Sequence, residues 1–175
     1  MTFEELLDRV PDYARDLKLN LGNLVKQAEL TGNQTWGTVA ACAIAARQAT
    51  LTPALVAEAA AHLTPENLQA ARTAAALMGM NNIYYRFTHL VTGDKYANIP
   101  ARLRMQGIRT HGGDPVDFEL FCLAVSAIHN CQACVGAHEK VLLEKGITEE
   151  TIVASVRLAA VIHALGIVFD NEAAQ

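Results

Sequence analysis

The chain has 175 residues, of which 51% are apolar and 18% are charged, and its net charge is −4. This composition excludes an intrinsically disordered chain, and the length suits one domain over residues 1–175. The negative charge supplies no basic surface for nucleic acid or an anionic membrane. No stretch approaches 18 uninterrupted apolar residues, and no secretion signal is recognisable. We therefore expect a cytoplasmic protein with neither nucleic acid nor membrane as a partner.

Helix start signals recur along the chain, and the apolar residues between them follow helical spacing. Capping side chains precede a proline or a carboxylate at five places: Thr2 with Glu5, Thr52-Pro53, Thr64-Pro65, Asp114-Pro115 and Thr148-Glu149. Strand-like alternation is nearly absent, and abundant alanine with only 6% aromatic residues favours close-packed helices. The sequence therefore predicts an all-α fold of roughly eight or nine helices.

A connector rich in Gly, Pro and Asn covers about residues 92–114, with a short helix expected near 100–106. The connector separates two similar halves. Residues 41–46 resemble 121–126, and residues 64–68 resemble 148–152. These similarities suggest an internal repeat over about 38–90 and 116–170, within a single domain.

The most informative motif is the CxxC pair of Cys131 and Cys134, followed by His138. Two thiols at this spacing can close a short disulfide, and an imidazole four residues further on can exchange a proton with the second thiol. Asn130 can cap a helix over 131–145, which would place both thiols and the imidazole on one face. Within such a helix the dipole favours a thiolate at Cys131.

Glu119 lies twelve residues before the first cysteine, in a segment that is otherwise almost uncharged. The helix expected around it is apolar almost all round, so a carboxylate there needs a partner. Consecutive helices joined by a short turn pack against each other, which would bring Glu119 to His138. The carboxylate could then hold and polarise the imidazole, or accept a proton through it.

A zinc site is the main alternative reading of these residues, with Cys131, Cys134 and His138 joined by Glu119 or His129. Structural zinc sites usually gather their ligands from two separate knuckles, whereas three of these candidates share one helix. Because the sequence has no second CxxC pair, we favour a dithiol redox centre with no bound metal. As the neighbour of the first cysteine, His129 could tune the thiols instead.

The remaining candidates have structural interpretations. Cys42 and Cys122 lie in apolar helices without basic neighbours, and we interpret both as packing residues. The polar and aromatic cluster at 78–86 suggests structural or subunit contacts, in which Arg86 could meet a carboxylate. The other histidines have no partner that the sequence reveals.

Five stretches of the chain resemble the alkyl hydroperoxide reductase AhpD family, within the carboxymuconolactone decarboxylase-like superfamily: 17–21, 36–38, 78–86, 118–120 and 124–139. The resemblance covers essentially the whole length. Its specific part is the spacing of Glu119, Cys131, Cys134 and His138. It implies an AhpD-like helical subunit that assembles as a trimer.

The resemblance also implies an antioxidant, lipoyl-dependent peroxidase with a Cys131–Cys134 disulfide. Cys134 would become the sulfenic acid or mixed disulfide, Cys131 would be the resolving thiol and proton donor, and Glu119 with His138 would relay protons. The expected partners are an AhpC-type peroxiredoxin, which the enzyme returns to its dithiol form, and a lipoylated 2-oxoacid dehydrogenase subunit. Dihydrolipoamide on that subunit donates electrons and is recharged by dihydrolipoamide dehydrogenase, so no cofactor is bound.

Two details depart from this scheme. The helix dipole alone would select Cys131 as the nucleophile, whereas the family assigns that role to Cys134, beside the proton relay. Some members also carry a histidine immediately before the second cysteine, where this chain has Ala133. Disulfide reduction needs only the dithiol and is expected to survive that change.

Two other functions remain as alternatives. One is a decarboxylase or lactone-processing enzyme like the namesake of the superfamily, which has no need of two cysteines at redox spacing. The other is a non-enzymatic, zinc-stabilised helical module. Whatever the function, the sequence also predicts a homo-oligomer. A monomer of this length has little interior in which to bury the Ala-rich apolar helices expected over 39–46, 70–80 and 154–168.

Overall fold

The computed structural model describes residues 1–93, 95–96 and 98–174, and these residues are all helix, turn or irregular chain without a strand. This confirms the predicted all-α class. Along the described ranges the elements are α1 Phe3–Asp8, a 3-10 turn Asp12–Ala14, α2 Arg15–Leu24, α3 Gly32–Ala46, α4 Leu51–His62, α5 Pro65–Leu90, α6 Gly107–Thr110, α7 Pro115–Ile128, α8 Gln132–Glu144 and α9 Glu149–Ala173.

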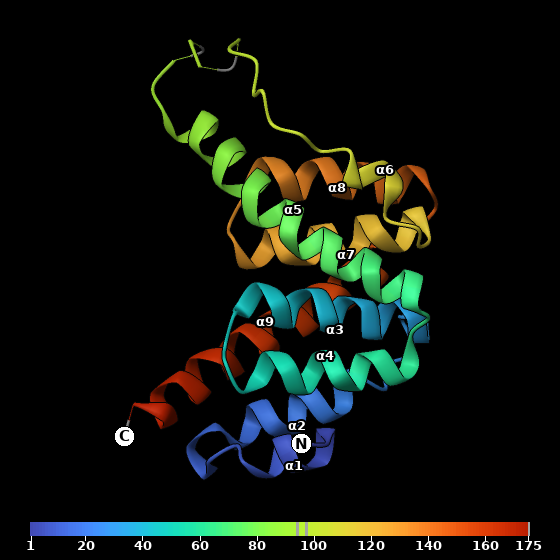
Figure 1. The fold of residues 1–175 in the computed structure, drawn as a ribbon, viewed down its shortest axis with the longest axis vertical. Helices are drawn as coiled ribbons and strands as arrows, with labels where there is room; N and C mark the ends of the chain where they lie inside the picture. The colour runs from blue at the N-terminus through green and yellow to red at the C-terminus, as the bar shows by residue number, and fades with distance from the viewer. Residues whose placement is uncertain (94, 97, 175) are drawn as a thin grey trace.

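Helix α3 occupies the centre of the molecule and packs against α4, α5, α7 and α9 (Figure 1). Helices α5, α7 and α8 lie together at one end of the view, and α1 and α2 lie at the other. The α3 sequence allows this central position because its inward side chains are small, so four helices can approach its backbone closely. The end formed by α5, α7 and α8 holds both cysteines of the CxxC pair.

Helices α3 and α7 approach each other closely at Gly37. A Cβ atom at this position would lie 2.0 Å from Cζ of Phe121, whose ring is 1% exposed. Glycine is therefore required here by the space that the phenylalanine ring fills. This contact fixes α7, and with it the position of Glu119, against the central helix.

Four of the five predicted N-terminal caps are confirmed: the Thr2 box with Glu5, Thr64, Asp114 and Thr148. The prediction for Thr52 was wrong, because α4 already begins at Leu51. Its first turn is held by the buried side chain of Gln48, whose Oε1 accepts hydrogen bonds from the backbone N–H groups of Thr50 and Leu51, both at 2.6 Å. The Thr52 hydroxyl donates to the carbonyl of Ala43 instead.

The connector contains a short helix, but four to seven residues later than predicted. Residues 100–106 are not helical, and α6 forms at Gly107–Thr110. The reason is tertiary: a Cβ at Gly107 would lie 3.1 Å from the side chains of Leu77 and Thr73, so this glycine lets the connector touch α5. The connector prediction also includes positions 94 and 97, which lie outside the described residues.

Helix α9 is the one described helix that is long and apolar enough, by length and composition alone, to cross a membrane. In the structure 61% of its most apolar window is buried inside the molecule, where it packs against α2, α3 and α7. Its apolar residues therefore build the core here. The single domain and its internal repeat over about 38–90 and 116–170 stay predictions.

We predict that Gly37→Ala lowers the free energy of unfolding by about 1–3 kcal/mol, because the added methyl group must displace the Phe121 ring in a packed core. Urea unfolding at one fixed protein concentration measures this. Gly136→Ala is the matched control, since Gly136 is exposed within α8 and an added methyl meets nothing within 4 Å. The control should be neutral or slightly stabilising, and an equal loss in both variants would contradict the packing argument.

Candidate active site

The turn from α7 to α8 places the first cysteine. Helix α7 starts on the Asp114 side chain, which accepts from the N–H groups of Val116 and Asp117, and it ends at Ile128. Asn130 then adopts a left-handed conformation with φ 53°, which Asn tolerates better than most residues. We had predicted Asn130 as the cap of a helix that begins at Cys131, and this was wrong, because Cys131 is itself the N-cap residue of α8.

Cys131 and Cys134 are joined as a disulfide, with their Cα atoms 5.3 Å apart. The two sulfurs differ in access. Cys131 is fully buried, and its backbone N–H donates to the carbonyl of Ser126, whereas Cys134 is 6% exposed and lines a cavity. A reactant that enters the cavity therefore reaches Cys134.

Glu119 and His138 lie together, as the sequence predicts. Oε2 of Glu119 is 2.6 Å from Nδ1 of His138, and the two side chains are 19% and 15% exposed. An ionised carboxylate can only accept hydrogen bonds, so we infer that Nδ1 carries the proton. The lone pair of the neutral imidazole is then on Nε2.

The other side of the imidazole faces the cavity. Nε2 of His138 lies 3.3 Å from Sδ of Met78, and a thioether has no proton to donate. His138 and Cys134 both line the same cavity, so a proton can pass between Sγ and Nε2 after a small rearrangement or through one water. The arrangement thus provides a base in the same cavity as the accessible cysteine and a carboxylate behind that base.

The cavity has a volume of about 290 Å³ and is lined almost entirely by apolar atoms. Its walls come from α5, the connector and α8: Met78, Asn81, Tyr85, Met105, Ile108, Ala133, Cys134, Ala137 and His138. The methyl group of Ala133 therefore forms part of this wall. Asn81 is the polar exception on α5, and its Oδ1 is buried without a hydrogen-bond partner among the described residues.

Helix α5 also holds the turn that precedes the disulfide. Asn82 is fully buried, accepts from the Ser126 hydroxyl at 3.0 Å and lies 3.1 Å from Nδ1 of His129. Arg86 donates to the carbonyl oxygen of His129 at 2.7 Å. We had expected a carboxylate as the partner of Arg86, and the structure corrects this to a backbone carbonyl. The polar cluster at 78–86 in an apolar helix indicates such contacts from the sequence, but it does not indicate which groups these side chains bind.

His129 is part of this anchor. The Asn82 amide can donate to Nδ1, and burial lowers the pKa of His129, as do the nearby Arg47 and Arg86. Both effects favour a neutral imidazole. No described hydrogen bond joins the ring to Cys131 or Cys134, so the expectation that His129 tunes the thiols gains no support from contacts.

The other two cysteines are packing residues, as predicted. Cys42 and Cys122 are free and fully buried, and burial raises the pKa of each thiol well above its ordinary value. Neither forms a reactive thiolate at neutral pH. Over the described part of the chain no three His, Cys, Asp or Glu side chains are placed to hold a metal ion, so the zinc alternative has no geometric support.

The chain is similar to proteins of one family along almost its full length. The carboxymuconolactone decarboxylase family profile matches residues 94–169. The chain is 56% identical to alkyl hydroperoxide reductase AhpD of Solibacter usitatus over 173 residues, which are 99% of this chain and 98% of that protein. It is 57% identical to the protein of the same name from Acidobacterium capsulatum, over 98% of this chain and 94% of that one.

A third relative, alkyl hydroperoxide reductase AhpD of Koribacter versatilis, is 53% identical over 98% of this chain and 89% of its own length. Identity at this level over whole chains is enough to share the fold. The chain therefore belongs to the alkyl hydroperoxide reductase AhpD family.

Proposed function

We propose that this protein is an antioxidant alkyl hydroperoxide reductase that works through the Cys131–Cys134 dithiol. The observation that supports this best is the disulfide at an apolar cavity. His138, which is paired with Glu119, lines the same cavity. The relatives carry this activity in their names. The cavity is suited to an uncharged alkyl chain, because its lining offers few polar groups.

The oxidative half of the reaction uses both thiols. The Cys134 thiolate attacks the outer oxygen of the hydroperoxide, the O–O bond breaks, and the alkoxide takes a proton and leaves as an alcohol. The cysteine is now a sulfenic acid. The Cys131 thiol attacks this sulfur, a water molecule leaves, and the disulfide forms, so one peroxide has accepted two electrons from two thiols.

Protons move through the histidine. Nε2 of His138 accepts the proton of the Cys134 thiol, and the Glu119 carboxylate stabilises the imidazolium that forms through the 2.6 Å contact with Nδ1. The same imidazolium then returns the proton to the leaving alkoxide. The fully buried Cys131 supplies the proton that departs with water.

The reductive half returns the disulfide to the dithiol state. As electron donor we propose dihydrolipoamide on a lipoylated 2-oxoacid dehydrogenase subunit, recharged by dihydrolipoamide dehydrogenase. The dithiol form in turn reduces an AhpC-type peroxiredoxin. A dithiol is a suitable donor because its second thiol resolves the mixed disulfide on Cys134 without a further reactant. No cofactor bound to this chain is required for these steps.

We also propose that the enzyme works in the cytoplasm as a homotrimer. Large apolar side chains are exposed on two long helices, with Ile83 on α5 57% exposed and Ile167 on α9 60% exposed. The redox residues come from two consecutive helices, so each subunit has a complete thiol site.

The first prediction here concerns the cysteines. In a reduced protein, Cys134→Ser should abolish consumption of cumene hydroperoxide, because no thiol is left at the cavity wall. Cys131→Ser should allow one turnover per chain and then stop as a sulfenic acid, since the resolving thiol is missing. Stopped-flow measurement of peroxide loss follows both. The control Cys42→Ala removes a buried thiol and should keep the wild-type rate, and undiminished turnover in Cys134→Ser would refute the assignment.

The second prediction concerns the proton relay. Glu119→Gln and His138→Gln should each slow the peroxide reaction at pH 7 by about 10²-fold, because the thiol loses its base. The deficit should shrink as the pH rises past about 8.5, where an ordinary thiol ionises unaided. His62→Gln is the matched control, since His62 pairs with Glu58 at 3.2 Å on α4, away from the cavity. A deficit that stays constant with pH would rule out this role.

The third prediction concerns assembly. Light scattering at micromolar concentration should give the mass of three chains, because the exposed apolar surfaces of α5 and α9 need cover. The mass should not depend on whether the disulfide is reduced, since the redox residues lie within one subunit. A stable monomer would contradict the assembly and leave the thiol chemistry unaffected.

A further inference from the structure

The connector has an unusual charge composition. Residues 95–113 contain Lys95, Arg102, Arg104 and Arg109 and no Asp or Glu. The whole chain has 14 Lys and Arg against 18 Asp and Glu, so the rest of it has 10 cations against 18 acids. An acidic protein thus carries one uninterrupted basic segment.

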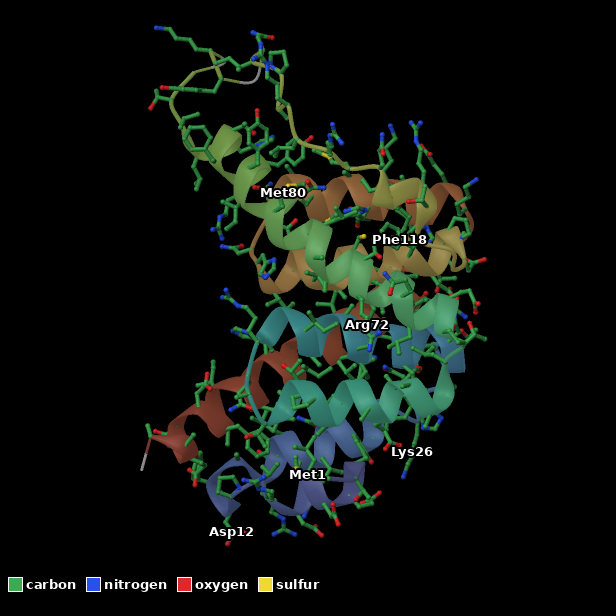
Figure 2. The ribbon with its side chains drawn as sticks, in the orientation of Figure 1. Met1, Asp12, Lys26, Arg72, Met80 and Phe118 are labelled. Carbon is green, nitrogen blue, oxygen red and sulfur yellow. A yellow bond between two sulfur atoms is a disulfide. The ribbon has the colours of Figure 1, made fainter. Side chains whose placement is uncertain are left out.

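This segment borders the redox cavity. Met105 and Ile108 line the cavity together with Cys134, and the neighbouring residues Arg104 and Arg109 are exposed. The connector returns from the far end of α5 to α6, alongside α5 and α8 (Figure 1), and Figure 2 shows nitrogen-ended side chains that extend from it into solvent. Arg104 and Arg109 therefore place positive charge beside the cavity in which the disulfide is reached.

The connector is held in place against α5. The Tyr84 hydroxyl donates to the carbonyl of Ile99 at 3.4 Å, and the rings of Phe87 and Tyr96 meet edge to face at 5.4 Å. The position of Gly107 against α5 fixes the other end. A surface that is anchored in this way can present its charges in a constant arrangement.

The charges have no opposite partner within the described chain. None of the four cations forms an ion pair with a described carboxylate. Unpaired cations at a cavity rim produce a positive potential that attracts an acidic surface.

Large apolar side chains stand among these cations. Five of them are exposed on the connector and the adjoining end of α5: Phe87, Leu90, Tyr96, Ile99 and Leu103. Arginine mixed with aromatic and aliphatic residues is the composition of protein–protein interfaces. A simple anion would leave this apolar area uncovered.

We propose that residues 95–96 and 98–109 form the docking surface for an acidic protein domain that carries a dithiol on a long flexible arm. This rests on the proposed function, because it names the delivery route of the reductant. Cys134 is only 6% exposed and lies in a cavity of about 290 Å³, so a reductant must present its thiol on a group narrow enough to enter that cavity. A slender apolar arm can enter while its domain stays on the basic rim.

The exchange balances without any further reactant. A thiolate of the arm attacks Sγ of Cys134, the bond to Cys131 breaks, and Cys131 leaves as a thiolate that takes a proton. The second thiol of the arm then attacks the mixed disulfide and releases Cys134. The arm is oxidised to a disulfide, and the enzyme gains two electrons.

The test compares one dithiol in two forms, free dihydrolipoamide and an isolated acidic lipoylated domain in its reduced state. The variant Arg102→Glu/Arg104→Glu/Arg109→Glu should reduce kcat/KM with the domain by about tenfold or more at low ionic strength. It should remain within about twofold of wild type with free dihydrolipoamide, which is uncharged. Raising the salt should shrink the difference between variant and wild type, because the Debye length falls below about 10 Å above 0.1 M.

The matched control reverses three charges at the opposite end of the molecule, with Arg9→Glu, Arg15→Glu and Lys26→Glu on and after α1 and α2. Figure 2 shows Lys26 far from the connector. This control should keep the wild-type rate with both donors. Free dihydrolipoamide that failed to reduce the wild-type disulfide would refute the proposed donor itself, which is a separate result.

Three outcomes would overturn the docking proposal. The first is an unchanged rate with the lipoylated domain, and the second is an equal loss with both donors, which would mean that the arginines shape the cavity. The third is a different occupant of the surface. Light scattering that shows dissociation of the variant would assign the segment to a second copy, and arginine-dependent sedimentation with phosphatidylglycerol vesicles would assign it to a membrane.

Discussion

A disulfide at the start of a helix can be presented to a cavity only if the preceding turn is held still, and here α5 holds it. The buried Asn82 amide binds the Ser126 hydroxyl, and the carbonyl of Ser126 in turn receives the backbone N–H of Cys131. Arg86 donates to the carbonyl oxygen of His129 in the same turn. The direction of α8, and therefore the meeting of His138 with Glu119, depends on these few hydrogen bonds between α5 and the turn. Buried polar networks of this kind specify one geometry, because every member left without a partner would be costly.

The four cysteines show how position alone determines reactivity. Cys42 and Cys122 sit within apolar helices, where burial raises their pKa and keeps them as inert thiols. Cys134 is also nearly buried, but it lines a cavity that the His138 imidazole also lines. The imidazole can accept the thiol proton there in place of bulk water. A reactive thiol in this fold thus needs a nearby base and an open path more than it needs exposure.

Much of the fold and the core of the candidate site could be predicted because their signals are local in sequence. The caps at Thr64, Asp114 and Thr148 and the pairing of Glu119 with His138 depend on spacing along one or two helices. The failures occurred where a distant residue decides the local structure. Gln48 caps α4 in place of Thr52, and the contact of Gly107 with α5 moves the connector helix. The acceptor that Arg86 binds could not be predicted for the same reason, because every residue has a backbone carbonyl and the sequence does not indicate which one is used.

The site divides chemistry and recognition between two parts of the chain. The thiols and the proton relay lie at α7, which packs against the central helix, and at α8, which packs against α7 and α5. The rim is built by the connector, which is part of neither helix. Substitutions in the connector can therefore alter which protein approaches without disturbing the distance from Glu119 to His138. In the function that we propose, small peroxides need only the apolar cavity, while a bulky reductant must dock before its arm can reach Cys134. Under that proposal, the buried disulfide behind a charged rim admits peroxides by size and polarity and selects its reductants by surface charge.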